Sequence, residues 1–256
     1  MPAETFARRL SRNILWNITG QGWLLLMTFL ATPFLIHRLG VELYGIYVLV
    51  AVLVDACSFA QFGIPDASVT YISERLARGE HRGGQETFWT AMLSQAAAGL
   101  AGAAMILSLT AVIVDHVFRV PEGLVPEARL AVAIGAMSFA LSMIAGVAAG
   151  MIRAVGRFDL LNMAGVLWGT LQTAAAVVLL WRGHSLSAIL VSNLCLQLMY
   201  LATIGLLACR LLPVTLPPAW NTGELIRLLR FGGFLTVSGF VAPILTNLEK
   251  MFLSAI

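Results

Sequence analysis

The stretch HRLGVELYG (37–45), followed by an apolar run and then by QFGIPDASVTYISERLARGE (61–80), decides how the rest of the chain can fold. It links a first long apolar segment, residues 13–36, to a second one, residues 44–73. A water-soluble protein could bury one such segment in its core. The segments that follow are just as apolar, however, so the chain needs an apolar environment outside itself.

The composition excludes an ordinary soluble domain. Of the 256 residues, 59% are hydrophobic and 11% are charged, whereas soluble domains carry roughly 25% charged residues. Apolar runs of about 20 residues recur, and each is long enough to cross a hydrocarbon layer of about 30 Å. We therefore predict an all-α, polytopic membrane bundle. A transmembrane barrel needs alternating segments of about 10 residues, and the sequence shows none.

The apolar runs predict about seven transmembrane helices. Their expected bounds are 13–36, 44–73, 89–114, 130–152, 160–181, 186–208 and 231–253. The second run is too long for a simple crossing, and Pro65 removes one backbone donor from it, so we predict a kink near Gln61. The charged segment 74–86 is expected to be a water-facing loop, with a short helical extension as an alternative for part of it.

Two pairs of glycines have the G-x-x-x-G spacing, Gly146 with Gly150 and Gly165 with Gly169. Glycines at this spacing let two helix backbones approach closely. We therefore predict tight helix packing at both pairs, with no implication for the ligand.

The longest connection, residues 209–230, contains three prolines and ends in a basic amphipathic turn. We expect it to be a linker between a six-helix lobe over 1–208 and the first helix of a truncated second lobe over 231–256. RNILWNITG (12–20) and RFGGFLTVSG (230–239) echo one another, which favours the start of a second repeat there.

The arginines predict the orientation of the chain in the membrane. Of the 15 arginines, 11 fall on the same side of the predicted crossings as the N-terminus, and 4 fall on the other side. Loops rich in arginine stay in the cytoplasm, so we predict a cytoplasmic N-terminus and a cytoplasmic linker. A net charge of only +3, with basic residues at helix ends, argues against nucleic acid as a partner.

No motif for catalysis, metal binding or a cofactor is found in the sequence. It contains no P-loop, no H-E-x-x-H and no G-x-S-x-G nucleophile turn. The three cysteines fit no metal-ligand spacing. We therefore predict a protein that is not an enzyme and that needs no metal or cofactor.

Charged residues inside the apolar segments are the remaining candidates for function. A charge near the middle of a bilayer costs about 3 kcal/mol or more unless it faces a partner or water. Asp55 is expected mid-helix between apolar neighbours, which favours a proton-binding, ion-binding or cavity-lining role. Asp66 has an alternative role in capping the kink at Pro65. Glu249 and Lys250 have an alternative role as a structural pair that reaches water.

Asn17 and Gln21 are four residues apart and so share one face of the first helix. Both hydrogen bonding between helices and lining of a polar cavity would turn that face inward. We expect Asn17, Gln21 and Asp55 to lie on the face that a second lobe would cover.

At these residues the sequence resembles the Wzx-type polysaccharide flippases of the multidrug/oligosaccharidyl-lipid/polysaccharide exporter superfamily. RLGVELYGIYVLV (38–50), with QFGIPDASVTYISERLARGE (61–80), is similar to the first hairpin of these flippases. LIRLLRFGGFLTVSGFVAPILTNLEKMFLSAI (225–256) is similar to their seventh helix. The chain has about half of their expected length, so the resemblance is to an N-terminal half.

The resemblance implies two six-helix lobes around a central cavity that opens to either side of the bacterial cytoplasmic (inner) membrane in turn. It implies transport of a polyprenyl-pyrophosphate-linked oligosaccharide to the periplasmic leaflet, as in O-antigen and lipopolysaccharide assembly. Membrane lipids, a coupling proton or sodium ion, and glycan polymerases are the other implied partners. A pyrophosphate needs basic groups, and Arg38, Arg75 and Arg153 are the nearest candidates.

Three other functions are compatible with the sequence. A cation-coupled multidrug exporter of the same superfamily would use Asp55 as its coupling acid. A membrane-embedded enzyme of glycan assembly is disfavoured, because the sequence lacks a large periplasmic loop and a recognisable histidine–acid pair. A half-length membrane scaffold without transport activity is the third alternative.

Overall fold

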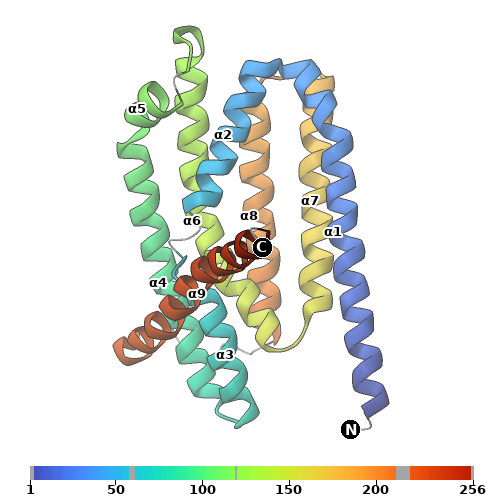
Figure 1. The fold of residues 1–256 in the computed structure, drawn as a ribbon, viewed down its shortest axis with the longest axis vertical. Coiled ribbons are helices and arrows are strands. Elements are labelled where there is room, and N and C mark those ends of the chain that lie inside the picture. Colours follow the sequence, from blue (N-terminus) through green and yellow to red (C-terminus); the bar gives the residue numbers. More distant parts are fainter. Residues whose placement is uncertain (1–2, 58–60, 119, 212–219, 255–256) are drawn as a thin grey trace.

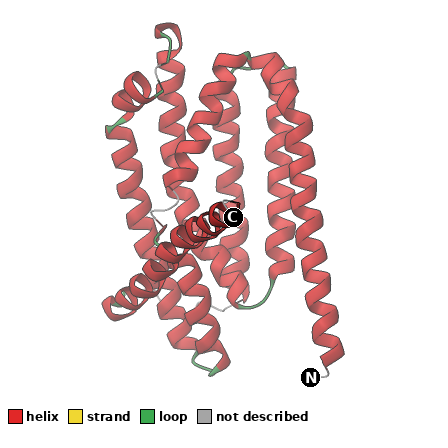
Figure 2. Cartoon of the chain, viewed as in Figure 1, coloured by secondary structure: helices red, strands yellow, loops and turns green. Residues whose placement is uncertain are grey.

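The structure is a computed structural model that describes residues 3–57, 61–118, 120–211 and 220–254, with side chains described between 18 and 238. The described residues form helices and no strands, which confirms the predicted all-α bundle (Figures 1 and 2). The elements are α1 (Ala3–Leu39), α2 (Val41–Cys57), α3 (Ile64–Ala77), α4 (His81–Ser108), α5 (Thr110–Val112), the π-helical turn η2 (Ile113–Val117), the 3-10 turn η3 (Glu122–Leu124), α6 (Val125–Ala154), α7 (Phe158–Trp181), α8 (Leu186–Leu211) and α9 (Thr222–Ser254).

The long helices run up and down the bundle, with α6 at its centre. α6 packs against α4 on one side and against α8 on the other, and α7 joins α8 to α1. Figure 1 shows α1 and α7 side by side, and α9 crossing obliquely in front of the bundle. α9 contacts α3 and α4. The turns after α3 and α6 lie at the same end of the bundle as the N-terminus (Figure 1).

Five helical segments are long and apolar enough to cross a membrane, as judged by length and composition among the described residues. They are residues 18–39 of α1, all of α4, the segment from η3 through α6, α7 and α8. The predicted second crossing is divided into α2, of 17 residues, and α3, of 14 residues, and neither spans a bilayer alone. The predicted seventh crossing lies mostly outside the residues with described side chains. The expected total of seven therefore stays a prediction.

The kink predicted near Gln61 is a complete break in the helix. Phe62 and Gly63 both have a positive φ, of 47° and 60°. A glycine adopts this conformation at no steric cost, whereas it is uncommon and strained for a phenylalanine. Pro65 then occupies the first turn of α3, where its missing N–H leaves no hydrogen bond unmade. The chain thus restarts a new helix instead of bending an old one.

Neighbouring helices hold the broken segment in place. Gly146 and Gly150 of α6 face Pro65, and a Cβ added to Gly150 would lie 3.0 Å from the Pro65 carbonyl oxygen. This confirms the close packing predicted for that glycine pair. From α4, the fully buried Gln95 donates its Nε2 hydrogen to the carbonyl oxygen of Gln61, at 3.0 Å. The break therefore finds a hydrogen-bond donor and a flat packing surface inside the bundle.

α9 crosses the break where its Gly232 meets Gly63, so neither residue has a side chain at the contact. A Cβ added to Gly232 would overlap the carbonyl oxygen of Phe62 and the backbone of Gly63, and a Cβ on Gly63 would overlap the Gly232 carbonyl. Such an approach is available only to glycine. At Gly233, the next residue, an added Cβ would meet nothing within 4 Å.

The glycine crossing predicts a large difference between two adjacent substitutions. We expect Gly232→Ala to destabilise the protein by about 1–3 kcal/mol, because an added methyl group must displace backbone. We expect Gly233→Ala to be neutral or to stabilise by up to about 1 kcal/mol, because alanine is the better helix former. Thermal unfolding of the two variants in detergent measures the difference, and equal melting temperatures would contradict the close crossing.

The charged segment 74–86, predicted to be a loop, is mostly helical. α3 continues to Ala77 and α4 begins at His81, so only residues 78–80 separate the two helices. Charged pairs one turn apart support the helix ends in water, Glu74 with Arg78 and Arg82 with Glu86. α9 likewise begins at Thr222, before the expected start of the seventh helix. Hydropathy marks the part of a helix that lies in lipid and misses the turns that extend beyond it.

Candidate functional site

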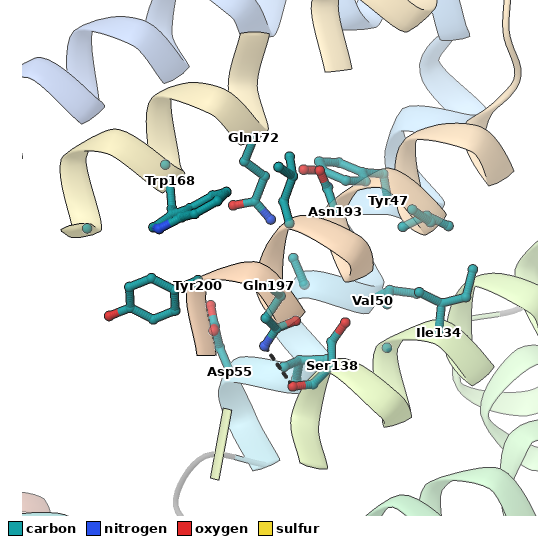
Figure 3. A pocket seen from close by; sticks show the side chains of 17 residues that line it. Tyr47, Val50, Asp55, Ile134, Ser138, Trp168, Gln172, Asn193, Gln197 and Tyr200 are labelled. Carbon is teal, nitrogen blue, oxygen red and sulfur yellow. Dashed lines mark hydrogen bonds between the residues drawn. The ribbon is translucent and has the colours of Figure 1, made fainter. Parts of the chain in front are cut away.

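A cleft of about 520 Å³ lies between α2, α6, α7 and α8 (Figure 3). Two of these helices supply most of its polar lining through residues one turn apart. Trp168 and Gln172 come from α7, and Asn193, Gln197 and Tyr200 come from α8. Because residues three or four apart share a face of a helix, both sets turn toward the same space.

The other two helices complete the wall. α2 contributes Tyr47 and Asp55, and α6 contributes Ser138. The Asn193 side chain forms a hydrogen bond with the Tyr47 hydroxyl. Gln197 donates its Nε2 hydrogen to the carbonyl oxygen of Ser138 at 2.9 Å, the dashed line in Figure 3. These contacts fix the orientation of both amides.

Two buried polar atoms in the cleft lack a hydrogen-bond partner among the described residues, the Asn193 Oδ1 oxygen and the Trp168 Nε1 nitrogen. A buried donor or acceptor without a partner costs about 1–3 kcal/mol. One is an acceptor and the other a donor. Both atoms are covered by neighbouring protein atoms, so a ligand in the cleft does not reach them without a rearrangement.

Gly165 and Gly169 also line the cleft. The predicted close packing is right for Gly169, where a Cβ would lie 2.7 Å from a methyl carbon of Leu24 in α1. It is wrong for Gly165, where an added Cβ would meet nothing within 4 Å. At that position the absent side chain enlarges the cleft, so the same sequence spacing serves packing at one residue and volume at the other.

Asp55 lies in the cleft wall, whereas Asp66 does not. Asp55 is exposed and stands two residues before the end of α2, because the helix break makes the expected mid-helix position wrong. Asp66 does not cap the break: the N-cap of α3 is Gly63, which makes no side-chain cap. Instead, the Asp66 carboxylate accepts a hydrogen bond from Arg153 Nη1 at 3.1 Å.

Arg153 lies in the last turn of α6 and is not one of the residues that line the cleft. Its guanidinium lies close enough to Tyr200, which lines the cleft, to act on the tyrosine hydroxyl electrostatically. Its Nε atom is buried and has no hydrogen-bond partner in the part of the chain that the structure describes. Of the three arginines predicted to meet a pyrophosphate, Arg153 is the one next to the cleft.

The remaining predicted site residues lie away from the cleft or outside the residues whose side chains the structure describes. Arg38 is exposed in the last turn of α1, with its guanidinium 5.7 Å from the centre of the Phe34 ring. Gln21 is exposed on α1 and does not belong to the cleft lining. The side chains of three predicted residues lie outside the described part: Asn17, Glu249 and Lys250.

Arg75 belongs to a partly buried network that ties α9 to α3 and α4. It donates to the Glu224 carboxylate at 2.5 Å and to the Gly83 carbonyl oxygen at 2.6 Å. The second oxygen of Glu224 accepts a hydrogen bond from Thr87 at 3.1 Å. The two charged side chains are only 15% and 12% exposed, so this arginine is committed to a structural ion pair.

This network predicts unequal effects for two nearby arginines. We expect Arg75→Ala to cost about 3–5 kcal/mol, because it leaves the Glu224 carboxylate buried without a counter-charge. Arg78→Ala is the matched control: its pair with Glu74 is exposed, so the cost should be at most about 0.5 kcal/mol. Unfolding in detergent checks both, and recovery of stability in Arg75→Ala/Glu224→Leu would confirm that the stranded charge is the cause.

Asp55 is the one lining residue that the sequence analysis proposed for the site. Sequence reasoning overlooked the other polar residues of the lining, which are Tyr47, Ser138, Trp168, Gln172, Asn193, Gln197 and Tyr200. The four-residue spacing of Trp168 and Gln172 repeats that of Asn193 and Gln197, which is visible in the sequence. This repeat was the available signal. For metals, the described residues contain no group of three or more His, Cys, Asp or Glu side chains that could hold an ion.

The apolar helices and the central polar cleft define a multi-pass helical membrane protein. The chain belongs to the polysaccharide biosynthesis protein family, whose family model matches residues 10–256. Comparisons with curated proteins and with solved structures gave no match. The family supports the broad part of the resemblance, a membrane protein of the polysaccharide exporter and flippase superfamily.

Proposed function

We propose that this protein forms part of a Wzx-type flippase, which moves polyprenyl-pyrophosphate-linked oligosaccharide across the bacterial cytoplasmic membrane. The observation that carries the proposal is the polar cleft at the centre of a bundle from the polysaccharide biosynthesis family. Polar side chains within apolar helices are expensive unless they face a partner, water or a ligand. A cleft open to the hydrophilic head of a lipid, while the lipid chain stays in the bilayer, suits such cargo.

In this proposal the lobe 1–208 presents the cleft, and the segment 231–256 begins a second lobe that closes over it. Alternating access would open the cleft first to the cytoplasmic side and then to the periplasmic side. Broken helices such as α2–α3 are common where transporters bind their substrates. Membrane lipids and glycan polymerases are the proposed partners outside the cleft.

Arg153 is the proposed contact for the pyrophosphate. Its Nε atom has no partner among the described residues, and its positive charge acts on Tyr200, which lines the cleft. Asp66 occupies one side of the guanidinium, so the lipid pyrophosphate would compete with this carboxylate. Arg75 is already neutralised by Glu224, and Arg38 lies at the opposite end of the bundle from Arg75 (α1 and α3 ends, Figure 1).

A cation-coupled exporter is the second candidate, because Asp55 places a carboxylate in the cleft wall. A proton or sodium ion bound there would drive the exchange between the two open states. Both candidates are transporters. The described residues that line the cleft include neither a histidine nor a cysteine that could act as a catalytic base or nucleophile.

Transport predicts a specific need for the Asp55 charge. We expect Asp55→Asn to lose most export of surface glycan while membrane abundance stays near wild type, because asparagine keeps the shape of the side chain and cannot titrate. Asp159→Asn is the control, since Asp159 pairs with the neighbouring Arg157 outside the cleft. The assay is glycan export in cells that lack the native transporter. Wild-type export by Asp55→Asn at equal abundance would remove Asp55 from the mechanism.

The same cells separate the two candidate transporters. A flippase restores surface glycan and does not change resistance to lipophilic cationic drugs. A drug exporter raises that resistance and leaves surface glycan absent. Either result decides which substrate class the cleft serves.

The charge asymmetry predicts the orientation in the membrane. In a cysteine-free background, Glu122→Cys and Ser185→Cys should react with a membrane-impermeant maleimide from outside the cell. Arg82→Cys should react only after permeabilisation, because the turn after α3 lies at the arginine-rich end of the bundle. Labelling of Arg82→Cys in intact cells would reverse the proposed orientation.

A further inference from the structure

The chemistry of the cleft lining is uncharged except at one position. Its main polar residues are three aromatic side chains and three amides: Tyr47, Trp168, Tyr200, Gln172, Asn193 and Gln197. Asp55 is the single charged residue, and the described residues of the lining include no arginine, lysine or histidine. The wall is thus neutral to acidic.

Such a wall is poorly suited to a phosphate. Phosphate oxygens are held by charge-assisted hydrogen bonds from arginine or lysine. Arg153, whose charge acts on Tyr200 of the lining, is outside the lining and is paired with Asp66 at 3.1 Å. An anion inside the cleft would meet the Asp55 carboxylate, and the described lining offers it no cation.

The same wall is well suited to a sugar ring. A sugar hydroxyl is both a donor and an acceptor. The Gln172 amide, which is exposed in the cleft wall, offers both a donor and an acceptor. Figure 3 shows the Trp168 and Tyr200 rings on one side of the cleft, with the Gln172 amide next to Trp168 and the Asn193 amide next to Tyr47. Flat aromatic faces cover the C–H face of a sugar, while amides meet its hydroxyls.

We infer that this cleft binds an uncharged sugar unit of the lipid-linked oligosaccharide and selects against acidic sugars such as uronic acids. The inference rests on the proposed function and divides the cargo between two places. The neutral sugar lies in the cleft, against the Trp168 ring and the Gln172 amide, and the pyrophosphate lies outside the cleft, at Arg153. Asp55 supplies the selection, because a sugar carboxylate would lie near a like charge. A volume of about 520 Å³ is in the usual range for small-molecule sites, about 300–1,000 Å³.

Binding to the purified full chain in lipid nanodiscs tests the inference. The probes are the methyl glycosides of glucose, galactose, mannose and N-acetylglucosamine, the glucuronic and galacturonic acid counterparts, and inorganic pyrophosphate, titrated by calorimetry. We expect at least one neutral glycoside to bind saturably, with its uronic acid on the order of tenfold weaker, as for one contact between like charges.

Three variants assign the binding to the cleft. Gln172→Leu keeps most of the side-chain volume and removes the amide donor and acceptor, so it should weaken the neutral glycoside about three- to tenfold. Asp55→Asn should strengthen the uronic acid toward the affinity of the neutral sugar. This gain cannot arise from misfolding, so it protects the test against unstable variants. Asp159→Asn, outside the cleft, should change neither affinity.

Several results would overturn the inference. They are the absence of binding by every neutral glycoside, equal affinity for a glycoside and its uronic acid, tighter binding of pyrophosphate than of any sugar, and an unchanged uronic acid affinity in Asp55→Asn. The proposed function fails separately, by the loss of glycan export. Export without sugar selectivity would leave the flippase standing and remove this site, whereas selective sugar binding without export would do the reverse.

Discussion

The broken backbone between α2 and α3 is the constraint on which the rest of the structure depends. In hydrocarbon, each backbone group without a partner costs several kcal/mol, so a helix can open only where neighbours satisfy or cover it. Gln95 supplies a donor to the Gln61 carbonyl. α6 and α9 bring glycines against the same segment, with Gly232 at the closest approach to Gly63. The packing of α4, α6 and α9 around this point follows from that need.

The break also explains the position of the cleft. Since α2 ends shortly after Asp55, this carboxylate lies near a helix end and beside a polar cleft instead of within a continuous helix in lipid. α3 starts afresh with Asp66 in its first turn, where a negative charge complements the helix dipole. α9 is held to α3 by the Arg75–Glu224 pair as well as by the glycine crossing. A displacement of α9 would therefore act directly on α3, and this contact would link a second lobe to the cleft.

Side-chain spacing identified residues that share a helix face, but it did not identify the cleft that those faces line. Asn193 and Gln197 share a face because they are four apart, and Gly146 and Gly150 pack closely because they carry no side chain. Spacing does not determine whether a helix face packs against another helix or lines a cleft. Gly165 and Gly169 have the same pattern as the first glycine pair, yet one of them enlarges the cleft. Trp168 lies among apolar residues in the sequence, and only the packing of α8 against α7 shows that it lines the cleft.

The sequence by itself determined the all-α membrane class, the apolar helices, the disruption near Gln61 and the excess of arginine at one end, because these follow from local composition and from a fixed helical rise. Tertiary structure decided which polar groups meet. Arg75, predicted to contact the substrate, instead pairs with Glu224, 149 residues away in the chain. Arg153 is the predicted arginine whose charge acts on a residue of the cleft lining, Tyr200. The reason is that a side chain's role depends on its partners in space, and contacts between distant helices are set by packing that no local pattern records.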